Sequence, residues 1–559
     1  MEQARLFLAI ALSFLVFFVW EFFMVERETV QNPEKPPSHL EDAGEVAKEP
    51  GSAPEVAPYV KEGEPSAFSA ESAYPSRGDE PAPRIITISS QKYTARISEK
   101  GGVFKSFVLR DYRERVEADS PPKEMVSPEL PRGTLVTDFV GKSLPGLENA
   151  VFSAETESDT AQVYNQPRDI SFSWQSPHGV TVEKIFHFSP DTYMIGFSVI
   201  IKNGSDRPIR DSLSVGLAGI VSDSGNSAYG FEGPSALIND TLEQIAPGDI
   251  EDKDVFRGKL GWTSVETRYF LSGLIPAKAA ADAEMRLFTK DRLLENRYVN
   301  PVSDIQPGTQ HRSEFSLFIG PKSLSVLEGL NNGLDKVVNF GWFDVIAKPC
   351  LWLMNFLHGV IPNYGVSIII LTVMIKLVLW PLGNKSYKSM REMKKIQPLM
   401  TEIREKYKDD RKRMNEELMG LYKTYKINPM GGCLPMVLQI PVFIALYRML
   451  YEAIELRHAP FVGWINDLSA PDRLFHFSFD VPFMDAPDGI PVLTIVMGAT
   501  MFLQQKMSPP PGDPAQAKIM MLMPIMFTFI FINFSSGLVL YWLVNNVLSI
   551  AQQYYVSKK

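Results

Sequence analysis

The chain carries three kinds of hydrophobic pattern, and each predicts a different architecture. The first is a nearly continuous apolar run over residues 6–25, which is about long enough to span a membrane. No small-residue cleavage site follows it, so residues 1–25 predict an uncleaved N-terminal transmembrane anchor rather than a signal peptide. Residues 26–84 then lose all periodicity and hold ten prolines with an acidic balance. They predict a disordered linker, because they bury too little apolar surface to offset the entropy of ordering.

The second pattern covers residues 85–322. Short runs such as Val103–Leu109 and Val182–Phe188 alternate apolar and polar residues, and Gly, Pro, Asn and Asp separate them. Alternation with β-branched and aromatic residues is typical of half-buried strands. We therefore predict a large all-β sandwich domain over residues 85–322.

Helical spacing begins after this domain. Residues 323–360 predict a connecting helix and then an aromatic, amphipathic helix in the membrane interface. Residues 361–559 contain apolar runs that predict five more transmembrane helices. These runs are Gly365–Leu382, Cys433–Leu450, Pro491–Met507, Ile519–Phe534 and Leu538–Val556. The expected fold is a polytopic α-helical membrane protein with six transmembrane helices, five of them forming a core, and one large all-β domain.

Residues 383–427, between the first two core runs, are basic and amphipathic. They hold 13 basic and seven acidic residues, and their apolar residues recur every three or four positions up to a break at Lys408-Asp409-Asp410. This pattern predicts a cytoplasmic helical hairpin. It is either a solvated segment that sets the orientation of the chain or a docking platform for ribosomes and nascent chains.

Charge in the short loops sets the expected topology. Residues 456–489 hold two arginines and five aspartates and should face outward, whereas the basic hairpin should face inward. Both termini are then cytoplasmic and the β domain is periplasmic, in the inner membrane of a cell with an outer membrane.

The overall net charge of −9 averages over parts of the chain that differ in composition. For example, 18 of the 23 methionines follow residue 341. The two cysteines, Cys350 and Cys433, lie in or beside apolar segments, which excludes a disulfide scaffold. The chain lacks the common nucleotide, zinc and nucleophile motifs. We expect no catalytic residues, no metal, no cofactor and no direct nucleic-acid partner.

Lys376 is the main candidate for function. A cation inside an apolar span costs roughly 3 kcal/mol or more at mid-bilayer and therefore marks a site by default. The alternative is that it snorkels, because Pro381 places it about 7 Å from the expected helix end. Polar residues of other spans could line an interior near it, although such residues also bond helices together. These are Thr372, Gln439, Thr528 and Asn546.

Residues 428–443 read Asn-Pro-Met-Gly-Gly-Cys-Leu-Pro-Met-Val-Leu-Gln-Ile-Pro-Val-Phe. This stretch resembles the YidC/oxidase-assembly/Albino family of membrane protein insertases. Residues 505–509 and 536–542 support the resemblance, and Gly261-Trp262 with Tyr269-Phe270 resembles a signature of the family's periplasmic domain. The similarity covers essentially the whole chain and is weakest in the linker.

The resemblance implies an insertase and chaperone that works on nascent membrane proteins in the lipid bilayer, alone or with the Sec translocon. Five spans would enclose a hydrophilic groove, with Lys376 at the position of its single cation, where Gram-negative members often carry arginine. Thr372, Gln439 and Thr528 would line the groove. Tyr541 and Trp542 would contact substrate helices, and the β domain would be a super-sandwich of the sugar-mutarotase type.

Methionines of the third and fifth spans, including Met436 and Met526, offer an adaptable apolar surface for the same helices; ordinary helix packing is the alternative. Two rival functions remain. A secondary transporter or channel would use Lys376 as its substrate site, but paired inverted repeats are not apparent. A membrane-anchored carbohydrate-active protein would use carboxylates of the β domain.

Overall fold

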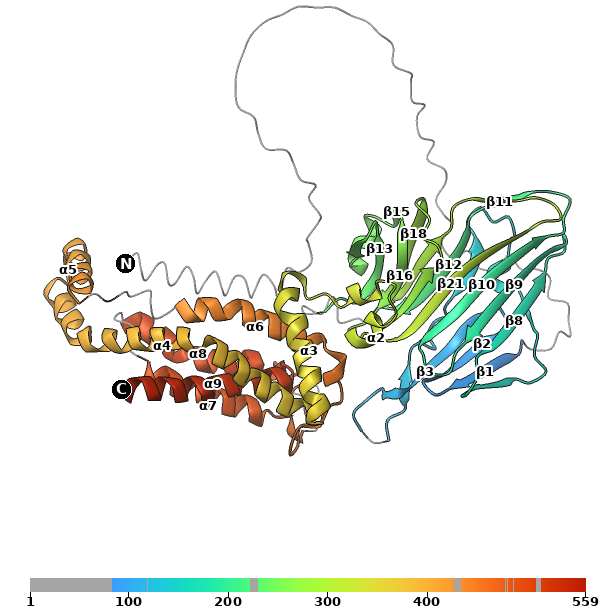
Figure 1. Cartoon of the computed structure of the whole chain (residues 1–559). Coiled ribbons are helices and arrows are strands. Elements are labelled where there is room, and N and C mark those ends of the chain that lie inside the picture. Colours follow the sequence, from blue (N-terminus) through green and yellow to red (C-terminus); the bar gives the residue numbers. More distant parts are fainter. Residues whose placement is uncertain are drawn as a thin grey trace, which may run out of the picture.

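The computed structural model describes residues 83–558 apart from 118, 222–229, 426, 428–433, 478, 480, 486 and 509–513. The expected anchor over residues 1–25 and nearly all of the linker lie outside the described residues. Figure 1 shows a β domain at one end and a bundle of helices at the other. Helix α3 (Asp344–Val360) stands between them, across the direction of the other helices.

The β domain is built from three large sheets. The nine strands of the first, in spatial order, are β14 (Thr241–Gln244), β13 (Gly233–Ile238), β16 (Leu260–Glu266), β17 (Phe270–Pro276), β21 (Gln310–Pro321), β10 (Met194–Asn203), β9 (Val180–Phe188), β8 (Arg168–Gln175) and β6 (Ser153–Ala154). The second sheet is β4 (Pro122–Glu124), β3 (Val103–Arg113), β2 (Tyr93–Ser98), β1 (Ile85–Ser90) and β7 (Thr160–Val163). The third is β15 (Val255–Gly258), β18 (Ala283–Lys290), β19 (Leu293–Val299), β12 (Leu213–Ile220) and β5 (Val136–Phe139). The β domain also contains a separate short sheet of two strands, β11 (Ile209–Asp211) and β20 (Ser303–Ile305).

The sheets pack through aromatic residues on alternate positions of their strands. In β9, Val182, Lys184, Phe186 and Phe188 are buried, while the residues that alternate with them are more exposed. Phe104 of β3 meets the Phe186 ring edge to face, with centroids 5.5 Å apart, so the second sheet closes over the first. The prediction of an all-β domain is confirmed, and the mutarotase type of sandwich stays a prediction.

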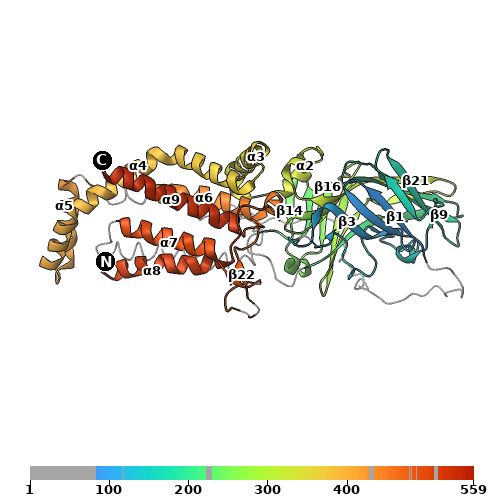
Figure 2. The same ribbon diagram turned by 90° about the horizontal axis from the view of Figure 1, so that it is seen from below.

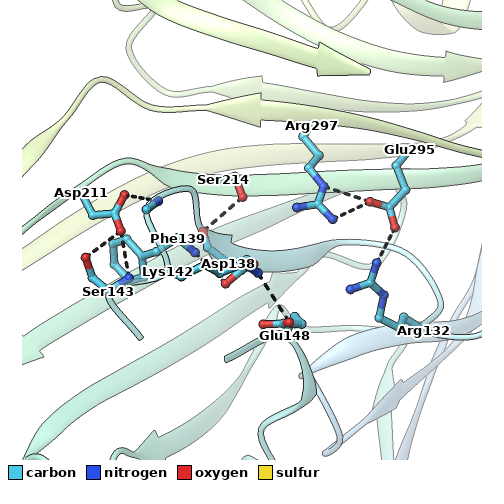
Figure 3. Close-up of polar contacts among 11 residues, drawn as sticks. Arg132, Asp138, Phe139, Lys142, Ser143, Glu148, Asp211, Ser214, Glu295 and Arg297 are labelled. Carbon is cyan, nitrogen blue, oxygen red and sulfur yellow. Dashed lines mark hydrogen bonds and ion pairs between the residues drawn. The ribbon is translucent and has the colours of Figure 1, made fainter. Parts of the chain in front are cut away.

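Polar contacts fasten the loop after β5 to the end of β11, just before the chain enters β12 of the third sheet (Figure 3). The Asp211 carboxylate accepts hydrogen bonds from the backbone N–H groups of Gly141 and Ser143 and from the Ser143 hydroxyl. Farther along the sheet, Glu295 pairs with Arg132 at 2.9 Å and with Arg297 at 2.6 Å. These carboxylates are therefore occupied by structural partners.

Among the described residues, the bundle contains five longer helices besides α3. They are α4 (Tyr364–Lys406), α6 (Leu434–Glu452), α7 (Val492–Met507), α8 (Pro514–Ile530) and α9 (Ser536–Lys558). Shorter elements are α2 (Leu324–Glu328), α5 (Arg411–Thr424), the 3-10 helices η1 (Leu147–Asn149), η2 (Pro247–Glu251), η3 (Leu334–Val337), η4 (Gly341–Phe343), η6 (Ile454–Leu456) and η7 (Phe531–Asn533), and the hairpin β22 (Leu474–His476)–β23 (Gly489–Ile490). Helix α9 is central, because α4 and α7 both pack along it and α6 touches it. Of the described helices, α4 alone is long and apolar enough to cross a membrane by length and composition; residues 518–533 are apolar but shorter.

Helix α4 differs from the sequence expectation at Pro381. We expected the helix to end there and the hairpin to begin as a separate element, but α4 runs without interruption for 43 residues. Proline removes one N–H from a helix, yet α9 braces α4 on both sides of this point. The Gln552 amide donates to the Trp380 carbonyl and to Asn384 Oδ1, each at 3.0 Å.

The β domain is joined to the bundle at the end of α6. Arg268 donates two hydrogen bonds, of 3.0 and 2.7 Å, to the Tyr451 carbonyl, and its guanidinium lies 3.5 Å from the centre of the Tyr451 ring. Just after α6, Arg457 donates to the carbonyls of Arg113 and Glu114 at 2.7 and 3.0 Å. Two arginines thus connect the β domain to the same end of one helix.

Candidate functional site

Lys376 lies half-buried between α4 and α9. Its Nζ donates a 2.6 Å hydrogen bond to the Ser549 hydroxyl and a longer one, 3.4 Å, to Asn545 Oδ1. Both partners sit on α9 four residues apart, so they occupy one face of that helix. The ammonium therefore points into the helix seam.

Gln439 of α6 completes a three-helix polar cluster. Its amide Nε2 donates to Asn545 Oδ1 at 3.0 Å, so one oxygen accepts from both Gln439 and Lys376. We refer to Lys376, Gln439, Asn545 and Ser549 as the lysine cluster.

The lysine cluster carries one positive charge and neutral hydrogen-bonding partners. Within the part of the chain that the structure describes, no carboxylate forms an ion pair with Lys376. A cation held by a hydroxyl and an amide keeps most of its attraction for an anion that approaches. The arrangement suits temporary binding of an acidic group better than a permanent structural pair.

The structure brings together only some of the residues that the sequence singled out. Thr372 is buried on α4, and its hydroxyl donates to the Ile368 carbonyl of its own helix at 2.6 Å. Thr528 likewise donates to the Pro524 carbonyl, at 2.7 Å, and lies against α7. Asn546 faces away from Lys376 and donates to Thr500 on α7 at 3.4 Å. None of these three side chains bonds to a member of the lysine cluster.

Two of the expected substrate-helix contacts, Tyr541 and Trp542, lie in an aromatic group on α9, on the N-terminal side of Asn545. Trp542 packs edge to face on Phe443 of α6, with centroids 4.4 Å apart, and lies 4.8 Å from Phe531 of η7. Tyr541 is buried on the same helix. Met526 is partly exposed on α8, and the side chain of Met436 lies outside the described residues.

Sequence reasoning missed Asn545 and Ser549. A signal was present, because Asn545, Ser549 and Gln552 recur at spacings of four and three along a predicted span, and such a stripe marks one polar helix face. In the structure, this face of α9 lies along α4.

Comparison with known proteins identifies the family of the chain. The YidC periplasmic domain matches residues 85–353, and the 60Kd inner membrane protein family matches residues 356–559. The membrane protein insertase YidC of Syntrophobacter fumaroxidans is 40% identical over 565 residues, covering 100% of both chains. That of Syntrophus aciditrophicus is 38% identical and covers 99% of both.

Among solved structures, an active YidC insertase with its first transmembrane domain resolved is 19% identical to this chain. The match covers 85% of this chain and 95% of that one, with a TM-score of 0.37, too low to add to the argument. The assignment to a family rests instead on the sequence relationships, which extend over essentially the full length of this chain and of each relative. The chain belongs to the YidC family of membrane protein insertases.

Proposed function

We propose that the lysine cluster is the place where this insertase receives acidic, hydrophilic segments of nascent membrane proteins. The observation that carries the proposal is the contact of Lys376 with Ser549 and Asn545, which positions a cation among neutral groups inside the bundle. The protein is an insertase of the inner membrane with a periplasmic domain, and it is not an enzyme.

The proposed mechanism is physical. A hydrophilic groove lined by Lys376, Thr372, Gln439, Thr528 and Asn546 would spare a polar segment part of its dehydration cost. Lys376 adds a Coulomb attraction for Asp and Glu, which is stronger in a medium of lower dielectric constant than in water. The apolar part of the substrate then leaves along Tyr541, Trp542, Met436 and Met526 into lipid. Its transfer, at about 25 cal/mol per Å² of buried apolar surface, drives completion.

We further propose six transmembrane helices, formed by the anchor over residues 1–25 and by α4, α6, α7, α8 and α9, with both termini in the cytoplasm. The arrangement in Figure 1 supports this topology, because α5 and the C-terminus lie at the end of the bundle opposite the β domain. Loops rich in Lys and Arg face the cytoplasm, so the basic hairpin would lie on the cytoplasmic side and the β domain on the periplasmic side. The hairpin would meet the ribosome, and the bundle would work alone or beside the Sec translocon.

The test is a matrix of Lys376 variants and substrates. Lys376→Arg should retain insertion of a small protein with an acidic translocated segment. Lys376→Ala should block it, and Lys376→Glu should be worse because like charges repel. Neutralising the acidic residues of the substrate should relieve the Lys376→Ala defect, as measured by protease accessibility in cells.

Lys394→Ala, which removes an exposed cation from the same helix, is the matched control and should have no effect on either substrate. If Lys376→Ala handles acidic and neutral substrates equally well, Lys376 does not receive acidic segments.

A further inference from the structure

The segment between α6 and α7 ends in a hairpin with an exposed aromatic tip. Residues 474–484, which include β22, contain four phenylalanines in eleven positions. Phe475, Phe479 and Phe483 are 71%, 63% and 92% exposed, and the Phe477 and Phe479 rings stack with centroids 5.1 Å apart. A concentrated apolar patch of this kind marks an interaction surface.

The tip is held in place beside the end of α8. The Arg473 guanidinium, at the base of the hairpin, donates to the Ile532 carbonyl at 2.8 Å and to Asn533 Oδ1 at 3.1 Å. The Asn533 amide in turn donates to the Phe483 carbonyl at 3.1 Å. The phenylalanines are therefore presented in a fixed position relative to the bundle.

The aromatic tip continues an apolar surface of the bundle. The last turn of α8 exposes Phe529 and Ile530, and these residues belong to a helix of a membrane insertase. Figure 2 shows β22 projecting at the end of α7 and α8 that is nearer the β domain. The hairpin thus stands where these helices would leave the hydrocarbon on the periplasmic side.

We propose that this hairpin is a membrane anchor whose phenylalanines insert into the outer leaflet of the inner membrane, at the boundary between acyl chains and headgroups. Lipid is the occupant that the chemistry favours. The sequence of the tip carries one charged side chain, Asp480, so it offers little for a polar protein partner to recognise. Apolar rings at the end of a helix bundle gain most by burial in the interface.

The proposed anchor also fits the length of its neighbour. Helix α7 has 16 residues and is therefore about 24 Å long, shorter than the roughly 30 Å of hydrocarbon in a typical bilayer. A hairpin inserted into the outer leaflet would keep the lipids of that leaflet close to the end of the short helix α7. The bilayer would then be thinner at this side of the bundle.

The experiment places a fluorescent probe at the tip. Cys350 and Cys433 are replaced by Ala, and Phe483→Cys is labelled with an environment-sensitive dye in the otherwise cysteine-free full-length protein. The labelled protein is reconstituted alone in vesicles of phosphatidylethanolamine and phosphatidylglycerol that carry nitroxide groups near the headgroup or deep in the acyl chain. Val302→Cys, which labels an exposed apolar residue of the β domain, is the matched control.

We expect blue-shifted emission at position 483 and quenching by the shallow nitroxide at least severalfold stronger than at position 302. Phe475→Cys should behave like Phe483→Cys. Equal quenching at positions 483 and 302 would overturn the proposal. So would a blue shift that appears only when a nascent chain or translocon is added, since the occupant would then be a protein.

Discussion

The Lys376 ammonium lies 2.6 Å from the hydroxyl oxygen of Ser549, and this hydrogen bond joins α4 to α9 inside the bundle. A hydroxyl stabilises the cation without neutralising it. The charge therefore remains able to attract a substrate carboxylate, whereas an internal salt bridge would have competed with that substrate. Several consequences can be measured.

Asn545 and Asn546 are adjacent, but we expect their replacement to have different effects. Asn545→Leu removes the acceptor shared by Lys376 and Gln439, and a buried donor left unpaired costs about 1–3 kcal/mol. Insertion of acidic substrates should fall more than insertion of neutral ones. Asn546→Leu breaks a contact with Thr500 on α7 and should affect both substrates alike. The same substrate pattern in both variants, measured by protease accessibility, would remove Asn545 from the site.

Gly498 lets α7 and α8 approach closely. A β-carbon at this position would lie 2.1 Å from Thr528 Oγ1, so Gly498→Ala should lower the melting temperature of the protein in detergent. Overpacking of this kind costs about 1–3 kcal/mol. Adding Thr528→Ala should restore most of the loss, because the nearest remaining atom is then 3.2 Å away. Gly359→Ala on α3 meets nothing within 4 Å and should be neutral or slightly stabilising.

The packing of α5 on α4 should matter more than the charge of the hairpin. Met400 is buried with Ile396, Leu418 and Tyr422, and the Tyr422 hydroxyl lies 3.9 Å from the Met400 sulfur. Met400→Pro should impair insertion, because proline within a helix costs about 3 kcal/mol or more. Replacing the exposed Lys394 and Lys395 by Gln should be tolerated. Equal insertion yields for the two changes would leave the hairpin as a solvated, orienting segment.

Lys184 should make the stability of the β domain depend on pH. Its ammonium is fully buried in β9 and donates to the Gly101 carbonyl at 2.7 Å. Burial lowers the pKa of Lys184 from 10.5 to about 7, and the nearby Asp138 opposes this shift. Between these two pH values the unfolded chain binds more protons than the folded protein, so stability rises with pH. The slope approaches about 1.4 kcal/mol per pH unit.

The urea midpoint of the β domain, followed by circular dichroism from pH 7 to 10, measures this slope. Lys184→Met should flatten it and raise stability most at pH 7. Lys278→Met, which removes an exposed lysine, should leave the slope unchanged. A slope that survives in Lys184→Met would assign the pH dependence to other groups.

The sequence identified the residues whose chemistry is unusual for their surroundings. Lys376 and Gln439 stand out because apolar spans rarely carry such groups, and the structure brings both into one cluster. The all-β domain was likewise predictable, because alternation at period two over many short runs matches the side-chain period of a strand and not that of a helix.

The partners of Lys376 were harder to predict, because α9 has polar residues on several faces. Whether Asn545 or Asn546 faces α4 depends on the rotation of α9, which long-range packing sets. The Thr372 and Thr528 hydroxyls bond to carbonyls four residues earlier in their own helices, an option that is open to any helical threonine. Pro381 was assigned to a helix end because local rules cannot include the hydrogen bond that Gln552 donates to Trp380 from 172 residues away.

The continuity of α4 makes that helix a lever. Lys376 divides it into arms of about 18 Å toward Tyr364 and about 45 Å toward Lys406, at 1.5 Å per residue. A sideways push at the Lys406 end would therefore reach the region of Lys376 as a smaller displacement with a larger force. A cargo that pulls on the hairpin would do mechanical work at the seam between α4 and α9.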